Sequence, residues 1–273
     1  MITVKDLSYA YQGSKRKVFD DFSLTIEDNG IYGLLGKNGT GKSTLLYLIS
    51  GLLRPKSGSV DIDGAESFKR RPEMLEDLFL VPEEFDMPEI SLHQFVKINS
   101  VFYPHFSEEL LKECLRDFDV DPGSNLKRLS MGQKKKVYMS YAIATNTRLL
   151  LMDEPTNGLD IPSKSLFRKV VASHMDEGRT LIISTHQVHD IENLLDHIII
   201  IDQSHVLLDA STIDITSRYA FRTIPTDEAG SAIYSEPSIG GLNAILPHKA
   251  DEPETQINLE LLFDAAVANK IKG

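Results

Sequence analysis

The sequence predicts an α/β protein. We expect a parallel-sheet core, an N-terminal antiparallel β subdomain, an inserted helical subdomain and a small C-terminal α+β extension. Three observations predict this fold class. Short, nearly continuous apolar runs alternate with helical stretches, as in strands that are buried on both faces of a parallel sheet. The first residues alternate between apolar and polar, and the central region repeats its apolar residues with a helical period.

The alternating segment opens the chain. Ile2, Val4 and Leu7 alternate with polar residues, the pattern returns at residues 22–26, and a polar turn at residues 12–17 separates the two stretches. Alternation with a period of two is typical of half-buried strands. We therefore expect antiparallel strands here.

The apolar runs that predict the parallel sheet come next. They are residues 31–35, 148–152, 181–184 and 198–201. Parallel strands need crossover connections, and the helical stretches between these runs provide them. The carboxyl ends of such strands share one edge of the sheet, which is where ligands of open parallel sheets bind.

Two regions stand apart from this core. The region from about residue 88 to residue 144 has a helical pattern, in which Leu110, Cys114 and Leu115 follow Ser107, the expected cap residue. From residue 211 the composition shifts to Thr, Ser, Pro, Gly and Glu, and the chain ends in an amphipathic helix. We therefore divide the chain into a domain at residues 1–210 and an accessory module at residues 211–273.

Composition and charge exclude several classes of protein. The 273 residues carry a formal net charge of −11, which opposes non-specific binding to nucleic acid or to anionic lipid. A single cysteine, Cys114, cannot form an internal disulfide framework, and this favours the cytosol. The first residues lack the pattern of a leader, and no apolar run approaches the roughly 18 residues of a membrane helix. We expect a membrane role only through a partner.

A phosphate loop is the first chemical motif. GKNGTGKS at residues 36–43 fits G-x-x-x-x-G-K-[ST], with an apolar strand before it and a helix after it. Glycines let backbone N–H groups turn toward phosphate oxygens, Lys42 can reach the β and γ phosphates, and the Ser43 hydroxyl can bind magnesium. The core is thus predicted to be of the P-loop NTPase type.

Polar side chains follow two further strands. Asp153 and Glu154 end the run LLLMDE, and His186 ends TLIISTH. We interpret Asp153 as holding magnesium through water, Glu154 as orienting or deprotonating the attacking water, and His186 as a γ-phosphate contact. The alternatives are a solvated acidic turn and a structural histidine.

The stretch RLSMGQKKKV, at residues 128–137, predicts a second anion site. Ser130 and Gln133 form a capping-box pattern at the start of a helix, and Gly132 allows an anion to approach the free N–H groups. The three lysines that follow, at residues 134–136, span too wide an arc of a helix to share one face. We expect them to be solvated or supporting charges and not a nucleic-acid site.

In their order and content, these motifs resemble those of the ATP-binding cassette (ABC) family over about residues 2–210. GKNGTGKST resembles Walker A, LLLMDEP resembles Walker B, RLSMGQ the signature, NGLD at residues 157–160 the D-loop, and STH the switch histidine. The resemblance implies ATP and Mg²⁺ as cofactors and Tyr11 as the aromatic ring that stacks on adenine; from the residues alone, Tyr9 is an equal choice. The implied catalytic residues are Glu154, His186 and Lys42. The implied nucleotide contacts are Tyr11, Gly36, Lys37, Asn38, Gly39, Thr40, Gly41, Lys42, Ser43, Thr44, Ser130, Gly132, Gln133 and Asp160, and the implied metal ligands are Ser43, Asp153 and Glu83.

Two positions depart from the family pattern. Met131 replaces the first glycine of the signature, and Glu83 stands where the family usually has a glutamine. A carboxylate can still supply an oxygen to magnesium. We therefore hypothesise that Glu83 ligates magnesium and couples the site to the helical subdomain.

The resemblance implies an ATPase that works with partners. In the family, the signature closes over ATP bound to a second cassette, so one phosphate loop and one signature predict a head-to-tail homodimer, or a heterodimer with another cassette. The function we expect is that of the ATP-hydrolysing subunit of an ABC transporter, with a separate transmembrane permease, at the cytoplasmic face of the membrane. The resemblance favours the ABC-2 exporter type. The alternatives are a soluble ABC ATPase that remodels a macromolecular or metal-cluster assembly, and a nucleotide sensor, which the presence of Glu154 and His186 disfavours.

Overall fold

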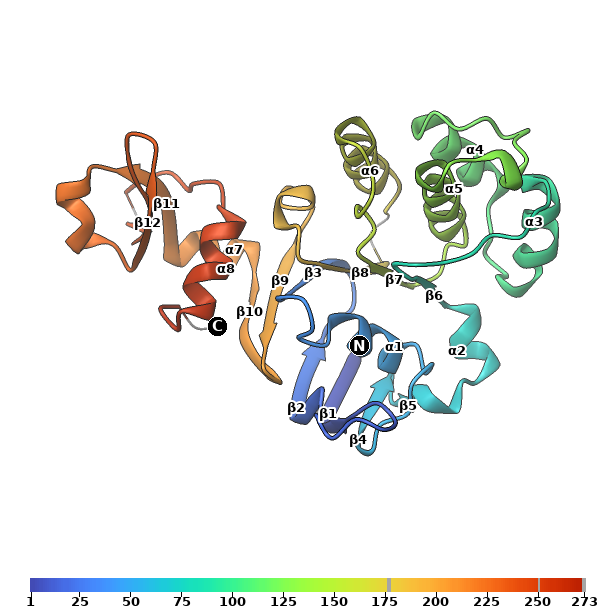
Figure 1. The fold of residues 1–273 in the computed structure, drawn as a ribbon, viewed down its shortest axis with the longest axis horizontal. Coiled ribbons are helices and arrows are strands. Elements are labelled where there is room, and N and C mark those ends of the chain that lie inside the picture. Colours follow the sequence, from blue (N-terminus) through green and yellow to red (C-terminus); the bar gives the residue numbers. More distant parts are fainter. Residues whose placement is uncertain (176–177, 250, 272–273) are drawn as a thin grey trace.

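The computed structural model describes residues 1–175, 178–249 and 251–271. Within them a mixed six-stranded sheet forms the centre of the molecule, in the order β10-β9-β3-β8-β7-β6 (Figure 1). Strands β9, β3, β8, β7 and β6 run parallel, and β10 pairs antiparallel with β9 at the edge. Its strands are β3 (Gly30–Leu35), β6 (Leu78–Val81), β7 (Leu149–Asp153), β8 (Thr180–Thr185), β9 (His197–Asp202) and β10 (His205–Ser211).

The expected antiparallel subdomain covers one face of this sheet. It is a sheet in the order β2-β1-β4-β5, and α1 packs with it below the central sheet (Figure 1). Leu34, Leu151 and Ile182 of the central strands face this side. The elements are β1 (Ile2–Tyr9), β2 (Phe19–Ile26), α1 (Lys42–Ile49), β4 (Ser57–Ile62), β5 (Ala65–Glu66), the 3₁₀ turn η1 (Ser67–Lys69) and α2 (Pro72–Glu76).

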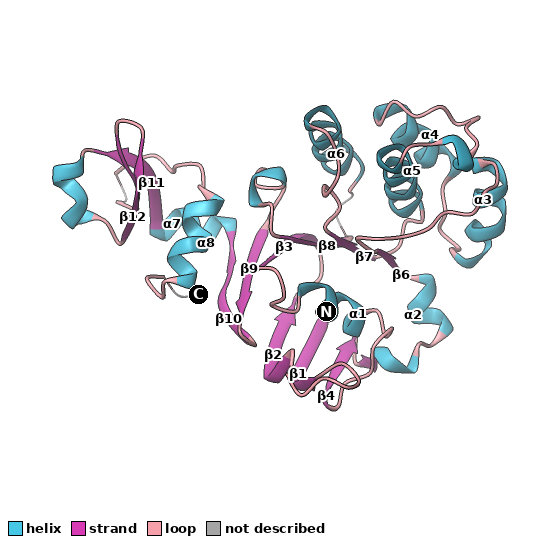
Figure 2. Ribbon diagram, viewed as in Figure 1, coloured by secondary structure: helices cyan, strands magenta, loops and turns pink. Residues whose placement is uncertain are grey.

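Helices cover the opposite face. Leu150, Leu181 and Ile183 of the central strands join a cluster with residues of α5 and α6 on this side. Because successive residues of a strand point to opposite faces, burial on both faces explains the continuous apolar runs. Figure 2 shows α3, α4 and α5 gathered beyond β6 as the expected helical subdomain. The elements are α3 (Leu92–Asn99), η2 (Ser100–Phe102), α4 (Glu108–Asp117), η3 (Leu126–Arg128), α5 (Met131–Ala144), α6 (Ile161–His174) and η4 (Val188–Asp190).

The C-terminal segment forms a small α+β unit beside β10 (Figure 1). Its sheet has the order β11-β13-β12, and α8 packs between this sheet and strands β9 and β10. The elements are α7 (Thr212–Arg218), β11 (Tyr219–Ile224), η5 (Thr226–Ser231), β12 (Tyr234–Ser238), β13 (Gly241–Pro247) and α8 (Leu259–Val267). The division at residue 210 stays a prediction.

The topology gathers four loops at one edge. Because β3, β6, β7 and β8 are parallel, the phosphate loop, Glu83, the Asp153–Glu154 pair and His186 all follow carboxyl ends of neighbouring strands. The helix that leaves the phosphate loop ends at Ile49, with Gly51 in the left-handed region at φ 71°.

Candidate nucleotide-binding and hydrolysis site

Two glycines of the phosphate loop occupy positions that leave no room for a side chain. Gly41 takes φ 107°, and a Cβ atom there would lie 2.8 Å from Phe19 Cζ. At Gly36 a Cβ atom would meet Thr40 Oγ1 at 2.5 Å and the Ile201 carbonyl oxygen at 2.7 Å. Only glycine fits both positions, so the loop from β3 to α1 can close tightly around a phosphate.

Lys42 is held inside this loop. The side chain is 6% exposed, and its ammonium donates to the carbonyl oxygens of Gly36 at 2.8 Å and of Lys37 at 3.3 Å. Burial lowers the pKa of Lys42, while the carboxylates of Glu154, Asp153 and Glu83 raise it in opposition. The two carbonyl oxygens thereby hold the Lys42 side chain within the phosphate loop.

Glu154 is the centre of a hydrogen-bonded cluster. It is 5% exposed, and its Oε1 lies 3.8 Å from the Lys42 ammonium. The Thr185 hydroxyl donates to Oε2 at 2.9 Å, the His186 backbone N–H donates to Oε1 at 3.0 Å, and Nδ1 of His186 lies 2.7 Å from Oε1. The strand pair β7–β8 thus brings together the two side chains that we expected to act on water and on the γ-phosphate.

Asp153 has the features of a metal ligand. It is 1% exposed, the Ser184 hydroxyl donates to Oδ1, and Oδ2 has no hydrogen-bond partner among the described residues. Burial raises the pKa of Asp153, against the hydroxyls of Ser184 and Ser43, which lower it. A buried carboxylate oxygen without a donor fits an oxygen-preferring cation such as Mg²⁺. Among the described residues no three His, Cys, Asp or Glu side chains form a ready-made metal site.

One cavity of about 550 Å³ joins most of the predicted site residues. Tyr11 lines it and donates to or accepts from Thr44 Oγ1 at 2.9 Å, whereas Tyr9 is only 8% exposed and packs in the core. The geometry favours Tyr11 over Tyr9 for contact with a base. The predicted residues that line the cavity are Tyr11, Asn38, Gly39, Gly41, Lys42, Ser43, Thr44, Glu83, Glu154 and His186.

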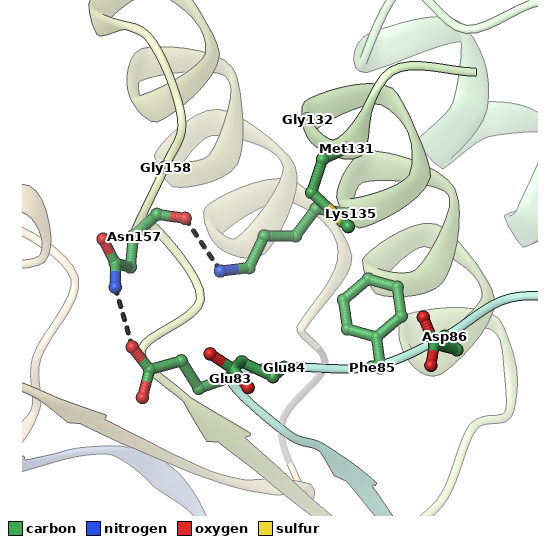
Figure 3. A pocket seen from close by; sticks show the side chains of 9 residues that line it. All are labelled: Glu83, Glu84, Phe85, Asp86, Met131, Gly132, Lys135, Asn157 and Gly158. Atoms are coloured by element: carbon green, nitrogen blue, oxygen red, sulfur yellow. Dashed lines mark hydrogen bonds between the residues drawn. The ribbon is translucent and has the colours of Figure 1, made fainter.

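The predicted signature residues lie elsewhere. Ser130 caps α5 by accepting from the Gln133 N–H at 3.3 Å, and Gln133 Oε1 accepts from the Ser130 N–H at 3.0 Å, which is the expected capping box. Gly132 lines a second cavity, of about 720 Å³, together with Met131, whose side chain is 63% exposed (Figure 3). The structure does not bring these residues to the chain's own phosphate loop.

Asp160 also lies outside the nucleotide cavity. It is the N-cap of α6 and accepts from the Ser163 N–H at 2.9 Å. Hydrogen bonding to the Ser163 side chain, and then to this N–H, lowers the pKa of the carboxyl. Between Glu154 and Asp160, Asn157 turns back and donates from Nδ2 to Glu83 Oε1 at 2.7 Å (Figure 3). Glu83 therefore contacts the D-loop as well as the nucleotide cavity.

Three further residues of this region were not predicted as site residues. Thr185 and Ser184 hold the two carboxylates, and a signal existed, since both precede His186 at the end of a buried strand. Lys135 is 5% exposed, so of the two roles expected for the three lysines, solvated charge and supporting charge, this one is not solvated. Its partners are backbone carbonyls, which a sequence pattern does not reveal.

Comparisons with known proteins agree with this geometry. The family model described as "ABC transporter" matches residues 19–157, about half of the chain. The ABC transporter ATP-binding protein YtrB of Bacillus subtilis is 32% identical over 72% of this chain and 68% of that protein. The bacitracin transport ATP-binding protein BcrA of Bacillus licheniformis is 30% identical over 76% and 68%, and the uncharacterised ABC transporter ATP-binding protein MJ1023 of Methanocaldococcus jannaschii is 29% identical over 96% and 97%.

The fold is also similar to that of a solved structure. A solved structure described as the ATP-binding subunit of an ABC transporter superimposes with a TM-score of 0.68 and 26% identity, over 78% of this chain and 91% of that one. The matched family model, the relatives and this structure lead to one conclusion. The chain belongs to the ABC transporter family and is one of its ATP-binding proteins.

Proposed function

We propose that this chain hydrolyses ATP in the cavity between its phosphate loop and Glu154, and thereby powers translocation of a substrate through a separate membrane-spanning partner. The observation that carries the proposal is the convergence of Lys42, Glu154 and His186 in the lining of one cavity. Lys42 would meet the β and γ phosphates, and Tyr11 would contact the base.

Glu154 is the residue we assign to the water. Its carboxylate is oriented by Thr185 and His186 and lies beside the Lys42 ammonium. A carboxylate held in this way can orient a water in line with the γ-phosphate and accept its proton, while Lys42 and His186 stabilise the charge on the phosphate oxygens. Ser43, Asp153 and Glu83 would hold Mg²⁺, which would neutralise charge on the phosphates.

The position of the signature supports a head-to-tail homodimer. Ser130 and Gly132 do not line the chain's own nucleotide cavity. The Gly132 N–H lies in the first turn of a helix of 14 residues, and such an N-terminus binds anions, whereas the Ser130 N–H is already bonded to Gln133 Oε1. We propose that the Gly132 N–H and the Ser130 hydroxyl close over the γ-phosphate of ATP bound to the partner subunit.

A second surface fits a permease. A groove of about 700 Å³ lies between α1, α2, β6 and η2, and apolar side chains line much of it. Val101 and Phe102 at its edge are 74% and 64% exposed, although both are apolar. Pro82, also in the groove, directly precedes Glu83, so a partner bound here would lie next to the nucleotide cavity.

The partner must supply the membrane span. Of the residues that the structure describes, none belongs to a helix long and apolar enough to cross a bilayer. We place the chain at the cytoplasmic face through its permease. BcrA is named for bacitracin transport, and together with Glu83 and the C-terminal extension this favours the ABC-2 exporter type.

The variant Glu154→Gln tests the hydrolysis. It keeps the size and the hydrogen-bonding oxygen of the side chain but removes the base, so steady-state ATP hydrolysis should fall by about 10² to 10⁴-fold. ATP binding should persist, since the phosphate loop is unchanged, and gel filtration with ATP and Mg²⁺ should then show a stable dimer. Unchanged turnover in this variant would refute the assignment of Glu154.

A further inference from the structure

Lys135, the middle one of the three lysines after the signature, is buried. Its side chain is 5% exposed, whereas Lys134 and Lys136 are both partly exposed on the same helix. The Lys135 ammonium donates to the backbone carbonyl oxygens of Glu154 and Asn157, each at 2.9 Å. Figure 3 shows the second of these hydrogen bonds, to Asn157. Lysine is seldom buried unless its charge has such partners, so these two hydrogen bonds define its role.

The two carbonyls belong to one strained turn. Glu154 takes φ 44°, in the left-handed region that disfavours side chains, and the Asn157 N–H donates to the Glu154 carbonyl oxygen at 3.1 Å. Strained residues persist where their surroundings hold them. Lys135 is hydrogen-bonded to the first and the last residue of this turn. It thereby helps to fix the backbone from which the Glu154 carboxylate projects.

Asn157 also links this turn to the loop that follows β6. The Asn157 side chain donates to Glu83 Oε1 at 2.7 Å, and Glu83 lines both the nucleotide cavity and the cavity beside the signature. Burial lowers the pKa of Lys135, while the carboxylates of Glu83, Glu154 and Asp153 raise it in opposition. Lys135 itself does not line the nucleotide cavity.

We infer that Lys135 is a positioning residue for ATP hydrolysis, which ties the signature helix α5 to the turn that carries Glu154 and to the D-loop at Asn157. The inference rests on the proposed function. In a head-to-tail dimer the signature of a chain contacts the partner's ATP and Glu154 acts on the chain's own ATP. Lys135 then joins the two sites through a single side chain.

The first test is Lys135→Met in the full-length chain, with Lys134→Met as the matched control. Methionine keeps the length and apolar stem but leaves two buried carbonyls without their ammonium donor. We expect kcat to fall by roughly 10 to 10²-fold, as misplacement of a reacting group does, with KM for ATP within about twofold because the phosphate loop is untouched. Lys134→Met should match the unsubstituted chain, and Lys135→Arg, which retains donors and charge, should recover most of the loss.

The second test is a double-mutant cycle with Glu154→Gln. If Lys135 acts through Glu154, Lys135→Met should reduce the residual hydrolysis of Glu154→Gln little further, since coupled residues are not additive. Melting temperatures verify that each variant is folded, and Lys135→Gln replaces Lys135→Met if the latter is not.

The outcomes separate the two proposals. Normal turnover in Glu154→Gln alone would refute the proposed function. A slow Glu154→Gln combined with unchanged kcat in Lys135→Met would overturn the role of Lys135. If Lys135→Met lowered kcat by the same factor in the unsubstituted chain and in Glu154→Gln, that result would also overturn the role of Lys135.

Discussion

Glu154 depends on residues from several parts of the chain. Its backbone turn is held by Lys135 of α5, and its carboxylate accepts hydrogen bonds from Thr185 and His186 at the end of β8. The parallel register that pairs Asp153 with Ser184 brings those donors into place. The orientation of this one side chain therefore depends on both the sheet and the signature helix.

The residues proposed to bind phosphate were the most predictable part of the site. The phosphate loop and the Asp153–Glu154 pair are contiguous in sequence, and their glycines and carboxylates indicate chemistry without any tertiary contact. Thr185 and Lys135 act on Glu154 from residues about 20 to 30 positions away. Only the sheet register and the packing of α5 place them there, so sequence alone did not identify them.

Cys114 gives a prediction about pH at the scale of one residue. Its side chain is fully buried in α4, and burial raises the pKa of the thiol from 9.0 to about 12. The folded state then binds this proton more tightly than the unfolded state. Its contribution to stability is fully present below pH 9 and is lost as the pH rises toward 12, by about 1.4 kcal/mol per pH unit.

The measurement compares urea unfolding of the chain and of Cys114→Ala under reducing conditions. Between pH 9 and 10, the unfolding free energy of the cysteine protein should fall by about 1 kcal/mol relative to that of Cys114→Ala. The reason is that only the unfolded state of the cysteine protein gains the thiolate. A thiol reagent should also label Cys114 slowly until the protein unfolds. A free-energy difference that is constant over this pH range would contradict the prediction.

The signature helix gives a prediction at the scale of an element. Gly132 lies in the first turn of α5, and a Cβ atom there would meet only Leu159 Cδ2, at 3.9 Å. Alanine therefore fits the isolated chain, and it stabilises a helix relative to glycine by about 0.5–1 kcal/mol. In the proposed dimer, however, the same methyl group lies where the partner's phosphate must approach.

We expect Gly132→Ala to melt no lower than the unsubstituted chain and to bind ATP normally as a monomer. In the Glu154→Gln background, the association constant of the dimer formed with ATP should fall by at least about tenfold, equivalent to about 1.4 kcal/mol. Gly230→Ala is the control, since a Cβ atom there has no neighbour within 4 Å and the glycine lies in the C-terminal unit. Dimerisation equal to that of the control would argue against a signature that contacts phosphate.

Elements differed in how well the sequence predicted them. The four apolar runs became β3, β7, β8 and β9, and the Ser107 and Ser130 caps start α4 and α5 as expected. Strand β6 was not predicted, because a run of four residues is too short to be distinguished from a loop by periodicity. Pairing of Leu78 with Leu149 makes it a strand, and this strand positions Glu83.

At the scale of the whole molecule, the C-terminal unit shares a hydrophobic core with the ATPase fold. Leu259 and Leu262 of α8 belong to the same buried cluster as Ile191 and Ile198. The Leu259 N–H also donates to Glu192 Oε1 at 2.9 Å. The segment after His186 is thus packed against α8, although the two are far apart in sequence.

A second set of contacts holds the same segment from the other side. Lys164 of α6 donates to Gln187 Oε1 at 2.8 Å and lies 2.7 Å from Asp190 Oδ2. His189 Nε2 lies 2.9 Å from Glu260 Oε2 of α8, although both side chains are largely exposed, so this pair adds little. The residues between His186 and β9 are therefore confined between α6 and α8.

The shared core predicts that the C-terminal unit and the ATPase fold unfold together. Leu262→Ala removes a fully buried side chain from the cluster and should cost about 2–5 kcal/mol. We expect a single calorimetric transition, shifted down by about 5–10 °C. Ile239→Ala is the control, because this side chain is fully exposed in the turn between β12 and β13 and should leave the transition unmoved. Two resolved transitions, of which Leu262→Ala shifts only one, would mean that the C-terminal unit folds on its own. Its contacts with the segment after His186 would then not couple its unfolding to that of the ATPase fold.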